Sequence, residues 1–236
     1  MISGLKIIPE ALVFDCGGTL LELNIPRENT FQEVLADEGL HVELELIRRA
    51  YDIVDWSFKQ RSSKETTLDA KKRFFDNFNI ALCDVLGLRS HALTLNEHLQ
   101  DAFKRRCNWQ ADDDTKEWLF WASKRFECYV LANWSRSLNQ VLDRAGIAHF
   151  FRGIYCSEEL GAEKPDPKSF EVFLNATNLR DKPRMYNGNE YIADVIGSRS
   201  FGFEPVLFDQ HGRYPPVADC FRISDWNQLR KYLTND

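Results

Sequence analysis

The feature that most constrains the fold of this 236-residue chain is an alternation of short apolar runs with helical segments over its second half. From residue 128 onward, the runs "CYVLANW", "GIYC" and "EPVLFD" have the length and apolar character of buried strands. Between them lie segments whose apolar residues recur at helical spacing, such as "SRSLNQVLDRAG" and "DPKSFEVFLNATN". This alternation predicts an α/β fold, a doubly wound parallel sheet with helices on both faces.

A first strand precedes this alternation and is separated from it by a long helical block. The strand is predicted at "ALVF" (residues 11–14), and from about Arg27 to Asn108 the apolar residues recur at helical spacing without a strong strand signal. The polar stretch "NWQADDDT" ends the block, and its last four residues are suited to cap the next helix. We therefore predict a sheet domain of residues 1–22 and 109–236, interrupted by an all-helical domain of residues 23–108.

Composition and charge exclude several classes of function. The formal net charge of -6 gives no electrostatic footprint for nucleic acid and little attraction to anionic lipid. No apolar run reaches the ~18 residues of a membrane span. The N-terminus lacks the basic head and apolar stretch of a signal peptide, so we expect a cytoplasmic protein. Six scattered cysteines without a C-x-x-C pair predict reduced thiols, and the histidines lack zinc spacing, so any metal should have oxygen ligands.

The ends of the predicted strands indicate where chemistry would occur. In an open parallel sheet, ligands bind beyond the carboxyl ends of the strands. The chain places Asp15, residues 132–134, residues 156–157 and residues 187–189 at these ends. A helical insertion that follows Asp15 directly would cover that edge as a lid.

The stretches at these strand ends resemble, in order, the motifs of the haloacid-dehalogenase-like (HAD) hydrolase superfamily, over nearly the whole chain. "DCGGT" (residues 15–19) stands where the superfamily has D-x-D-G-T after a strand. "AN" (132–133) takes the place of a Ser or Thr followed by Asn, and "EKPDPKSF" (163–170) is similar to the lysine motif. The segment 188–194 is similar to a last motif of Gly-Asp with a second Asp five residues on. The resemblance implies a Rossmann-like core with a helical cap domain.

The same resemblance implies the catalytic residues. Asp15 would be the nucleophile, a carboxylate that attacks phosphorus or an activated carbon and forms a covalent aspartyl intermediate. The structural alternative is an aspartate that only bonds the amides of the following turn. Lys164 would neutralise charge between Asp15 and the substrate, and its alternative is an ordinary surface lysine.

Substrate and metal contacts follow from the resemblance in the same way. The residues implied to contact substrate are Asn133, Gly17 and Thr19. The residues implied to bind Mg²⁺ are Asp15, Gly17 through its backbone carbonyl, Asn189 and Asp194. Asp194 has a second possible role, which is to orient Lys164, and an acidic residue near a helix start is also favourable by itself.

Three of these positions have lost a functional group. Gly17 stands where phosphatase members have a second aspartate, which protonates the leaving group and then activates water. Loss of such a positioned acid/base typically costs ~10²–10⁴-fold in rate. Ala132 has no hydroxyl for a phosphate, and Asn189 is a neutral replacement for a charged ligand of Mg²⁺, which is usually bound through carboxylates and phosphate.

Two specialised branches of the superfamily also lack the second aspartate. Haloacid dehalogenases usually have a tyrosine there, and phosphonoacetaldehyde hydrolases an alanine, which is closer to Gly17. The latter need an imine-forming lysine in the cap, and we assign this role to none of Lys59, Lys64, Lys71 and Lys72. The segment "SKETTLDAKKR", which also contains Arg73, is more typical of a solvated basic helix face.

We therefore predict a HAD-like hydrolase that acts on a small phosphorylated metabolite through Asp15, with Mg²⁺ as cofactor. Its activity would be weak or altered because Gly17 occupies the acid/base position. The alternative is a catalytically inactive member that binds a phosphate-like ligand or a protein partner. The sequence determines neither the substrate nor the oligomeric state.

Overall fold

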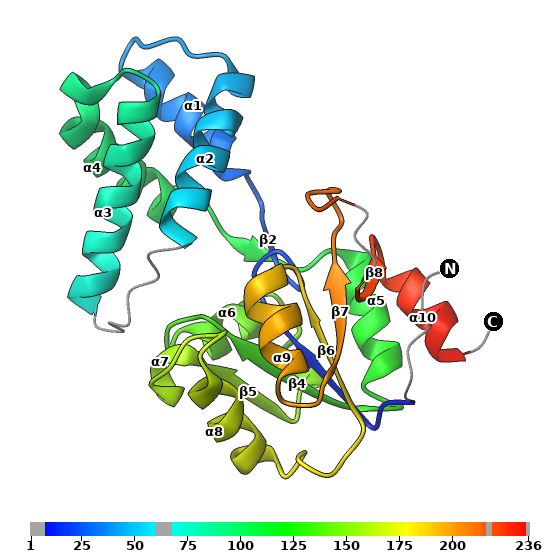
Figure 1. Ribbon diagram of the computed structural model, residues 1–236. Coiled ribbons are helices and arrows are strands. Elements are labelled where there is room, and N and C mark those ends of the chain that lie inside the picture. The colour runs from blue at the N-terminus through cyan, green and yellow to red at the C-terminus, as the bar shows by residue number, and fades with distance from the viewer. Residues whose placement is uncertain (1–7, 60–67, 216–218, 235–236) are drawn as a thin grey trace. The chain divides into compact units, whose positions relative to one another are not determined.

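A computed structural model describes residues 8–59, 68–215 and 219–234 of the chain. Backbone contacts divide the chain into two compact units, one of Met1–Glu22 with Gln110–Asp236 and the other of Leu23–Trp109. Figure 1 labels most of the helices and strands of each unit.

The first unit is built on a six-stranded, fully parallel sheet with the strand order β5-β4-β1-β6-β7-β8 (Figure 1). The strands are Ala11–Phe14 (β1), Glu127–Ala132 (β4), Gly153–Cys156 (β5), Arg184–Gly188 (β6), Glu204–Phe208 (β7) and Phe221–Ile223 (β8). Strand β1 lies between β4 and β6, and Val13 is in register with Tyr129 on one side and Tyr186 on the other. The predicted parallel α/β sheet is confirmed.

Helices follow most of the strands, as the alternation predicted. They are α5 (Asp113–Ala122), α6 (Leu138–Arg144), α7 (Ser157–Leu160), α8 (Pro167–Thr177), α9 (Gly197–Arg199) and α10 (Trp226–Thr234), with a 3-10 turn at Ala148–Phe150 and a π-helical turn, η3, at Tyr191–Ile196. The predicted cap of α5 is confirmed, because the Asp112 side chain accepts the Thr115 N–H at 2.6 Å. Helix α8 begins at Pro167, with Asp166 as its N-cap.

One layer of the core lies between the sheet and α8. It contains Ala11 and Val13 of β1 and Tyr186 of β6, together with Phe170 and Phe173 of α8. All five side chains are fully buried. This layer underlies the carboxyl ends of β1 and β6, where the predicted site begins.

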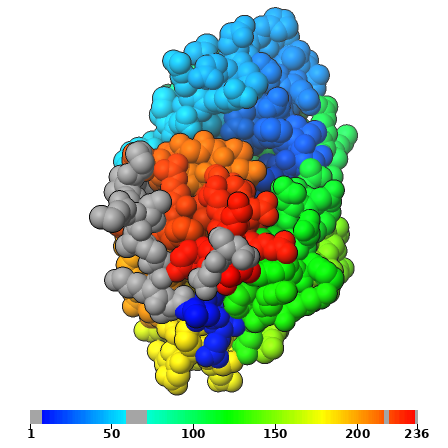
Figure 2. All heavy atoms as spheres, turned by 90° about the vertical axis from the view of Figure 1, so that its right-hand side faces the viewer, coloured from blue at the N-terminus to red at the C-terminus, as the bar shows by residue number. Residues whose placement is uncertain are grey.

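A second layer covers the opposite face of β1, because side chains alternate along a strand. Phe14 packs edge-on against Trp118 of α5 and Trp226 of α10, with ring centroids 5.6 and 5.8 Å apart. Figure 2 shows α10, in red, beside α5, in green. Since both faces of the sheet are covered, every residue of β1 is buried and its sequence is continuously apolar rather than alternating.

The second unit is helical, as predicted for this block. Its helices are α1 (Arg27–Asp37), α2 (Leu44–Lys59), α3 (Leu68–Val85) and α4 (Ala92–Arg106), with a 3-10 turn at Arg89–His91. Their apolar faces form one core around Phe31, Leu35, Ile47, Leu82 and Leu95, each at most 1% exposed.

Two short strands that the sequence analysis did not predict lie where the chain passes between the units. Strands β2 (Glu22–Leu23) and β3 (Trp109–Gln110) pair with each other in a two-stranded sheet. Two residues are too few to produce a period-2 pattern, so β3 was indistinguishable from a polar break in the sequence.

The apolar spacing of "YIADVIGSRSFG" (residues 191–202) by itself predicts a single helix, but the structure has a π-helical turn, η3, followed by the three-residue helix α9. The Asp194 N–H donates to the Glu190 carbonyl at 2.7 Å, and the Asp194 carboxylate accepts the Glu190 N–H at 2.9 Å. These two bonds join residues four apart at the start of the turn. Side-chain bonding of this kind does not follow from apolar periodicity, which is why the pattern predicted a regular helix.

The structure also gives the burial of the tryptophans and cap lysines and the state of the cysteines. Trp118 and Trp121 are buried in the core, whereas Trp56 is 71% exposed. Of the cap lysines, Lys72 is exposed, whereas Lys64 and the side chains of Lys59 and Lys71 lie outside the described residues.

The cysteines at positions 16, 83, 107, 128, 156 and 220 are free thiols, as predicted. None of the helices in the described part of the chain has the length and apolar character needed to cross a membrane.

We predict that Phe14→Ala lowers the free energy of unfolding by about 3–5 kcal/mol, because it removes a fully buried ring that packs edge-on against two tryptophans. Chemical denaturation followed by tryptophan fluorescence measures this loss. Phe120→Ala is the matched control, since Phe120 is 54% exposed and should change stability by less than about 1 kcal/mol. Equal effects of the two substitutions would contradict the packing of Phe14 against the two tryptophans.

Candidate functional site

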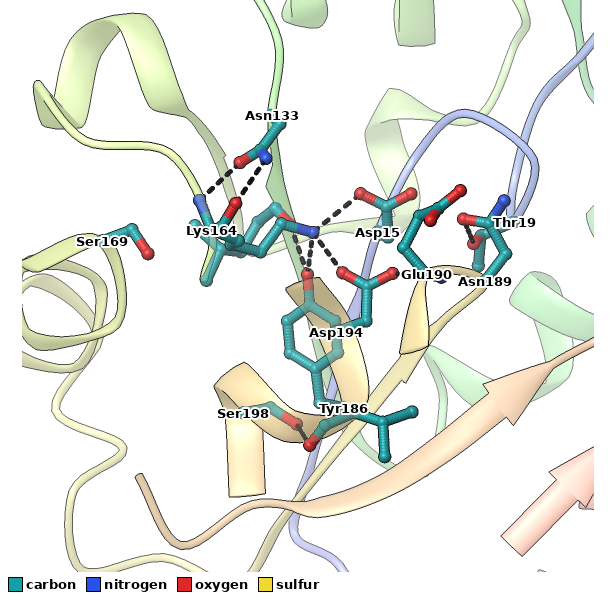
Figure 3. A network of polar contacts seen from close by, with 12 residues as sticks. Asp15, Thr19, Asn133, Lys164, Ser169, Tyr186, Asn189, Glu190, Asp194 and Ser198 are labelled. Carbon is teal, nitrogen blue, oxygen red and sulfur yellow. Dashed lines mark hydrogen bonds and ion pairs between the residues drawn. The ribbon is translucent and has the colours of Figure 1, made fainter. Parts of the chain in front are cut away.

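The predicted site residues of the sheet unit gather at the carboxyl edge of its central strands (Figure 3). Asp15 directly follows β1, and its N–H donates to the Asn187 carbonyl of β6 at 2.9 Å. Lys164 lies in the loop before α8, and Asp194 lies in η3 after β6. Since β1 and β6 are neighbours in the sheet, topology alone brings the two carboxylates to the same place.

The centre of the site is the Lys164 ammonium, which donates to three acceptors. Its Nζ lies 2.8 Å from Asp15 Oδ1, 2.6 Å from Asp194 Oδ1 and 2.5 Å from the Tyr186 hydroxyl. The Lys164 side chain is only 2% exposed. An ammonium has three N–H donors, and each has an acceptor here. Lys164 is therefore a buried site residue and not a surface lysine.

Two carboxylates share this single ammonium, which leaves an excess of negative charge in a buried place. Burial raises the pKa of the Asp15 carboxyl to about 6, an effect that the Lys164 charge opposes and the Asp194 charge reinforces. Burial lowers the pKa of Lys164, but the charges of Asp15 and Asp194 outweigh it and raise that pKa well above its usual range. The lysine thus stays protonated, and the Asp15 carboxyl is harder to ionise than an ordinary aspartate.

Asn133 holds the backbone of Lys164. Its side-chain oxygen accepts the Lys164 N–H at 2.7 Å, and its amide nitrogen donates to the Lys164 carbonyl at 2.9 Å. The Asn133 amide thus pairs with the N–H and C=O of one residue, as a backbone amide group of a neighbouring strand would. Figure 3 shows this pair of bonds beside the ion cluster. Both polar groups of Asn133 are therefore engaged with the loop that carries Lys164.

The turn after β1 packs closely against the residues that follow β6. Gly18 has a φ of +76°, a conformation that favours glycine, and a Cβ at this position would lie 2.3 Å from the amide nitrogen of Asn189. The Thr19 hydroxyl donates to Asn189 Oδ1 at 3.3 Å. Gly17 lacks this constraint, since its φ is not in the left-handed region. Glycine is thus required at position 18 by both the backbone conformation and the close approach of Asn189, whereas the φ of Gly17 does not require glycine.

Asp194 has both carboxylate oxygens engaged within the protein. Oδ1 accepts from Lys164, and Oδ2 accepts the Glu190 N–H at 2.9 Å. A Cβ on Gly188 would lie 2.3 Å from Oδ2, so glycine is needed there to admit the carboxylate. Of the two roles predicted for Asp194, this geometry favours orienting Lys164 over direct metal binding.

Ala132 ends β4 beside this cluster with a buried methyl group, 1% exposed. Ala132, Gly17 and Asn189 are thus neutral at the three positions where the resemblance implied a functional group, and the nearby carboxylate in this part of the site belongs to Glu190, which follows Asn189 (Figure 3). The charged half consists of Asp15, Lys164 and Asp194.

The sequence analysis missed Tyr186, which contributes the third acceptor to Lys164. Tyr186 is fully buried in β6, and its hydroxyl donates to the Leu131 carbonyl at 2.6 Å. Burial raises the pKa of the phenol well above its usual value, so it keeps its proton. The only signal in the sequence was a tyrosine within a continuously buried strand, "RMYNG", where its hydroxyl must find a partner.

The candidate donors for a divalent cation are the second oxygen of Asp15, whose first oxygen accepts from Lys164, and two neutral oxygens. In the described part of the chain, no three His, Cys, Asp or Glu side chains are grouped as metal ligands. Asp15 Oδ2, the Gly17 carbonyl and Asn189 Oδ1 are all hard oxygen donors, which Mg²⁺ prefers, and Mg²⁺ is often bound by one carboxylate together with substrate phosphate. The residues fit Mg²⁺ in chemical type, with one charge fewer than two aspartates would supply.

Comparison with known proteins identifies the family. Residues 9–186 match the sequence model of a hydrolase family described as haloacid dehalogenase-like hydrolase. The chain belongs to this family. Human haloacid dehalogenase-like hydrolase domain-containing protein 3 is 27% identical over 207 residues, which are 83% of this chain and 80% of that protein. Pyrimidine 5'-nucleotidase YjjG of Escherichia coli is 28% identical over 108 residues, 44% of this chain and 48% of that protein.

The fold of this haloacid dehalogenase-like chain is also found among solved structures. The HAD-hydrolase YfnB from Bacillus subtilis, determined with magnesium bound, superposes with a TM-score of 0.76. The likeness covers 97% of this chain and 100% of that one at 15% sequence identity, so it shows the fold alone. The predicted superfamily and fold class are confirmed.

We predict that Asp15→Asn stabilises the metal-free protein by about 1–3 kcal/mol above pH 6, since it removes the excess charge from the cluster. Because the pKa of Asp15 is raised in the folded state, the folded protein holds this proton more tightly than the unfolded chain. Its ionisation therefore lowers stability as pH rises from about 4 to 6. Urea unfolding in EDTA at pH 4, 5 and 7.5 should show the gain of the variant growing with pH. A gain that does not depend on pH would contradict the raised pKa of Asp15.

Proposed function

We propose that this chain hydrolyses the phosphate ester of a small metabolite, with Asp15 as the nucleophile. The observation that carries the proposal is the buried cluster in which Lys164 holds Asp15 and Asp194 on one ammonium. A buried carboxylate whose pKa is raised to about 6 is ionised at neutral pH and poorly solvated, which favours attack on phosphorus. The family membership and phosphatase-type relatives such as YjjG support the same reaction class.

In this mechanism an Asp15 oxygen forms a bond to phosphorus, and the bond from phosphorus to the ester oxygen breaks. The leaving oxygen takes the electron pair, and water then hydrolyses the aspartyl phosphate to regenerate Asp15. Lys164 acts as a fixed positive charge, because all three of its N–H groups are already bonded within the protein. Asn133 holds the backbone of Lys164, and Asp194 holds its ammonium, so the charge stays in place.

We also propose roles for the remaining residues. Asp15, the Gly17 carbonyl and Asn189 would hold Mg²⁺, which when bound would neutralise charge on the phosphate. Thr19 would fix the turn by its bond to Asn189. Residues 23–108 would act as the cap that selects the substrate. Gly17 supplies no proton to the leaving oxygen, so esters with a good leaving group should react fastest.

A second candidate function is a non-catalytic protein that binds a phosphate-like ligand. It is favoured by the three positions that lack a functional group, which are Gly17, Ala132 and Asn189. All three lie in the half of the site that would handle the leaving group, the phosphate and the metal, whereas the charged half is intact. Under this alternative, Lys164 would supply charge for ligand binding only.

We predict that purified protein hydrolyses p-nitrophenyl phosphate in the presence of Mg²⁺ and that Asp15→Asn lowers kcat at least ~10²-fold, since the nucleophile is removed. The release of p-nitrophenol with and without Mg²⁺ measures this. Asp143→Asn is a matched control on an acidic residue of α6 outside the cluster and should retain the rate. Equal rates for wild type and Asp15→Asn would remove phosphatase chemistry and leave the binding function.

We further predict that Gly17→Asp combined with Asn189→Asp raises kcat for alkyl phosphates by ~10²–10⁴-fold, because it supplies a positioned acid/base. The φ of Gly17 lies outside the left-handed region, unlike that of Gly18, so the backbone conformation does not oppose a side chain at position 17. Gly18→Asp should lower the melting temperature and give no gain. If the double variant folds and shows no gain in rate, the assignment of position 17 as the missing acid/base is wrong.

A further inference from the structure

The Lys164 ammonium has three acceptors. Two are carboxylates, with which it forms ion pairs, and the third is neutral. The third is the hydroxyl of Tyr186, 2.5 Å from Nζ (Figure 3). Of the groups around the ammonium, this is the one to which the family resemblance assigned no role. A buried N–H without an acceptor is costly, so the phenol completes the hydrogen bonding of the lysine.

The Tyr186 side chain reaches Lys164 by extending along one face of the sheet, beneath the neighbouring strand β1. It belongs to β6, yet its hydroxyl donates to the carbonyl of Leu131 on β4, and β1 lies between these two strands. Adjacent strands are about 4.8 Å apart, so the side chain and its 2.6 Å hydrogen bond together extend from β6 to β4. It passes under β1 in the layer that also contains Val13. The phenol thereby ties together the strands on both sides of Asp15.

The direction of the hydroxyl is fixed at both ends. The ring packs against Phe170 and Phe203, with centroids 6.0 and 5.9 Å away. The single hydroxyl proton is given to Leu131 at 2.6 Å, so only the oxygen lone pairs remain for Lys164. The phenol can then only accept from the ammonium. The phenol oxygen is thus one of three fixed acceptors that set the position of Nζ, and the other two are the carboxylates of Asp15 and Asp194.

We propose that Tyr186 is a positioning residue for Lys164, which holds the ammonium between Asp15 and Asp194 at the distance that the reaction requires. Without the hydroxyl, Nζ keeps two acceptors on one side and has a free N–H on the other. The ammonium then moves toward one carboxylate or binds water. The kinetic consequence rests on the proposed hydrolase function, but the effect on the lysine itself does not.

The first test observes the ammonium directly, with Tyr186→Phe and the matched control Tyr129→Phe. Tyr129 belongs to the same core layer, but its hydroxyl donates to Glu127 and not to Lys164. ¹H–¹⁵N spectra of ¹⁵N-lysine-labelled protein should show a slowly exchanging ammonium signal that is missing from Lys164→Arg. In Tyr186→Phe we expect this signal to shift and its hydrogen exchange to accelerate at least about tenfold. In Tyr129→Phe we expect it unchanged.

Two results would overturn the proposal. One is a Lys164 signal in Tyr186→Phe that matches the wild type in shift and exchange rate. The other is a wild-type protein without a protected ammonium signal, since Lys164 would then not be held. Because phenylalanine keeps the ring and its packing, the melting temperature of Tyr186→Phe should stay within a few degrees of that of Tyr129→Phe.

The second test is kinetic and uses p-nitrophenyl phosphate. Tyr186→Phe should lower kcat by about 10–100-fold with KM changed less than about threefold, because a displaced charge affects the reacting geometry more than ground-state binding. Tyr129→Phe should retain both constants. Unchanged kcat in Tyr186→Phe together with wild-type turnover would overturn the positioning role alone. Absence of wild-type turnover would overturn the proposed function, while the ammonium spectra still decide the position of Lys164.

Discussion

The arrangement of the site depends on one buried ammonium shared by two carboxylates. Lys164 comes from the loop before α8, Asp15 from the end of β1 and Asp194 from η3, so a single group fixes three segments that are distant in sequence. Taking these charges out of water is costly, and a buried ion cluster persists only when its partners and further hydrogen bonds are well placed. The surrounding structure therefore has to hold each of the three groups by more than their mutual attraction.

That additional support is visible on every side of the cluster. Asn133 binds both backbone groups of Lys164, the Glu190 N–H binds the second oxygen of Asp194, and Tyr186 accepts the third N–H of the ammonium. Each of these bonds comes from a different element at the carboxyl edge of the sheet. The ammonium is thus held both by charge and by neutral hydrogen bonds, which is the arrangement expected of a preorganised site.

The site is divided between two kinds of chemistry. The charged groups around Lys164 would serve the proposed nucleophilic attack, whereas Gly17, Ala132 and Asn189 are neutral at the positions where a leaving group, a phosphate and a metal would be handled. This division explains why a hydrolase and a ligand-binding protein are both consistent with one fold. Membership of the haloacid dehalogenase-like family and a TM-score of 0.76 to YfnB establish the architecture. Function depends on the site, because one fold supports many functions.

The sequence by itself determined the parallel sheet, the helical block and the places of Asp15, Lys164 and Asp194 on the chain. These follow from local patterns, because strand and helix periods are local and the carboxyl ends of parallel strands meet at one edge. Only the tertiary structure decided that the Asn133 amide binds the backbone of Lys164, that Tyr186 crosses beneath β1 to the ammonium, and that residues 191–196 form a π-helical turn. These features depend on side-chain direction and on contacts between residues far apart in the chain, which no local pattern contains.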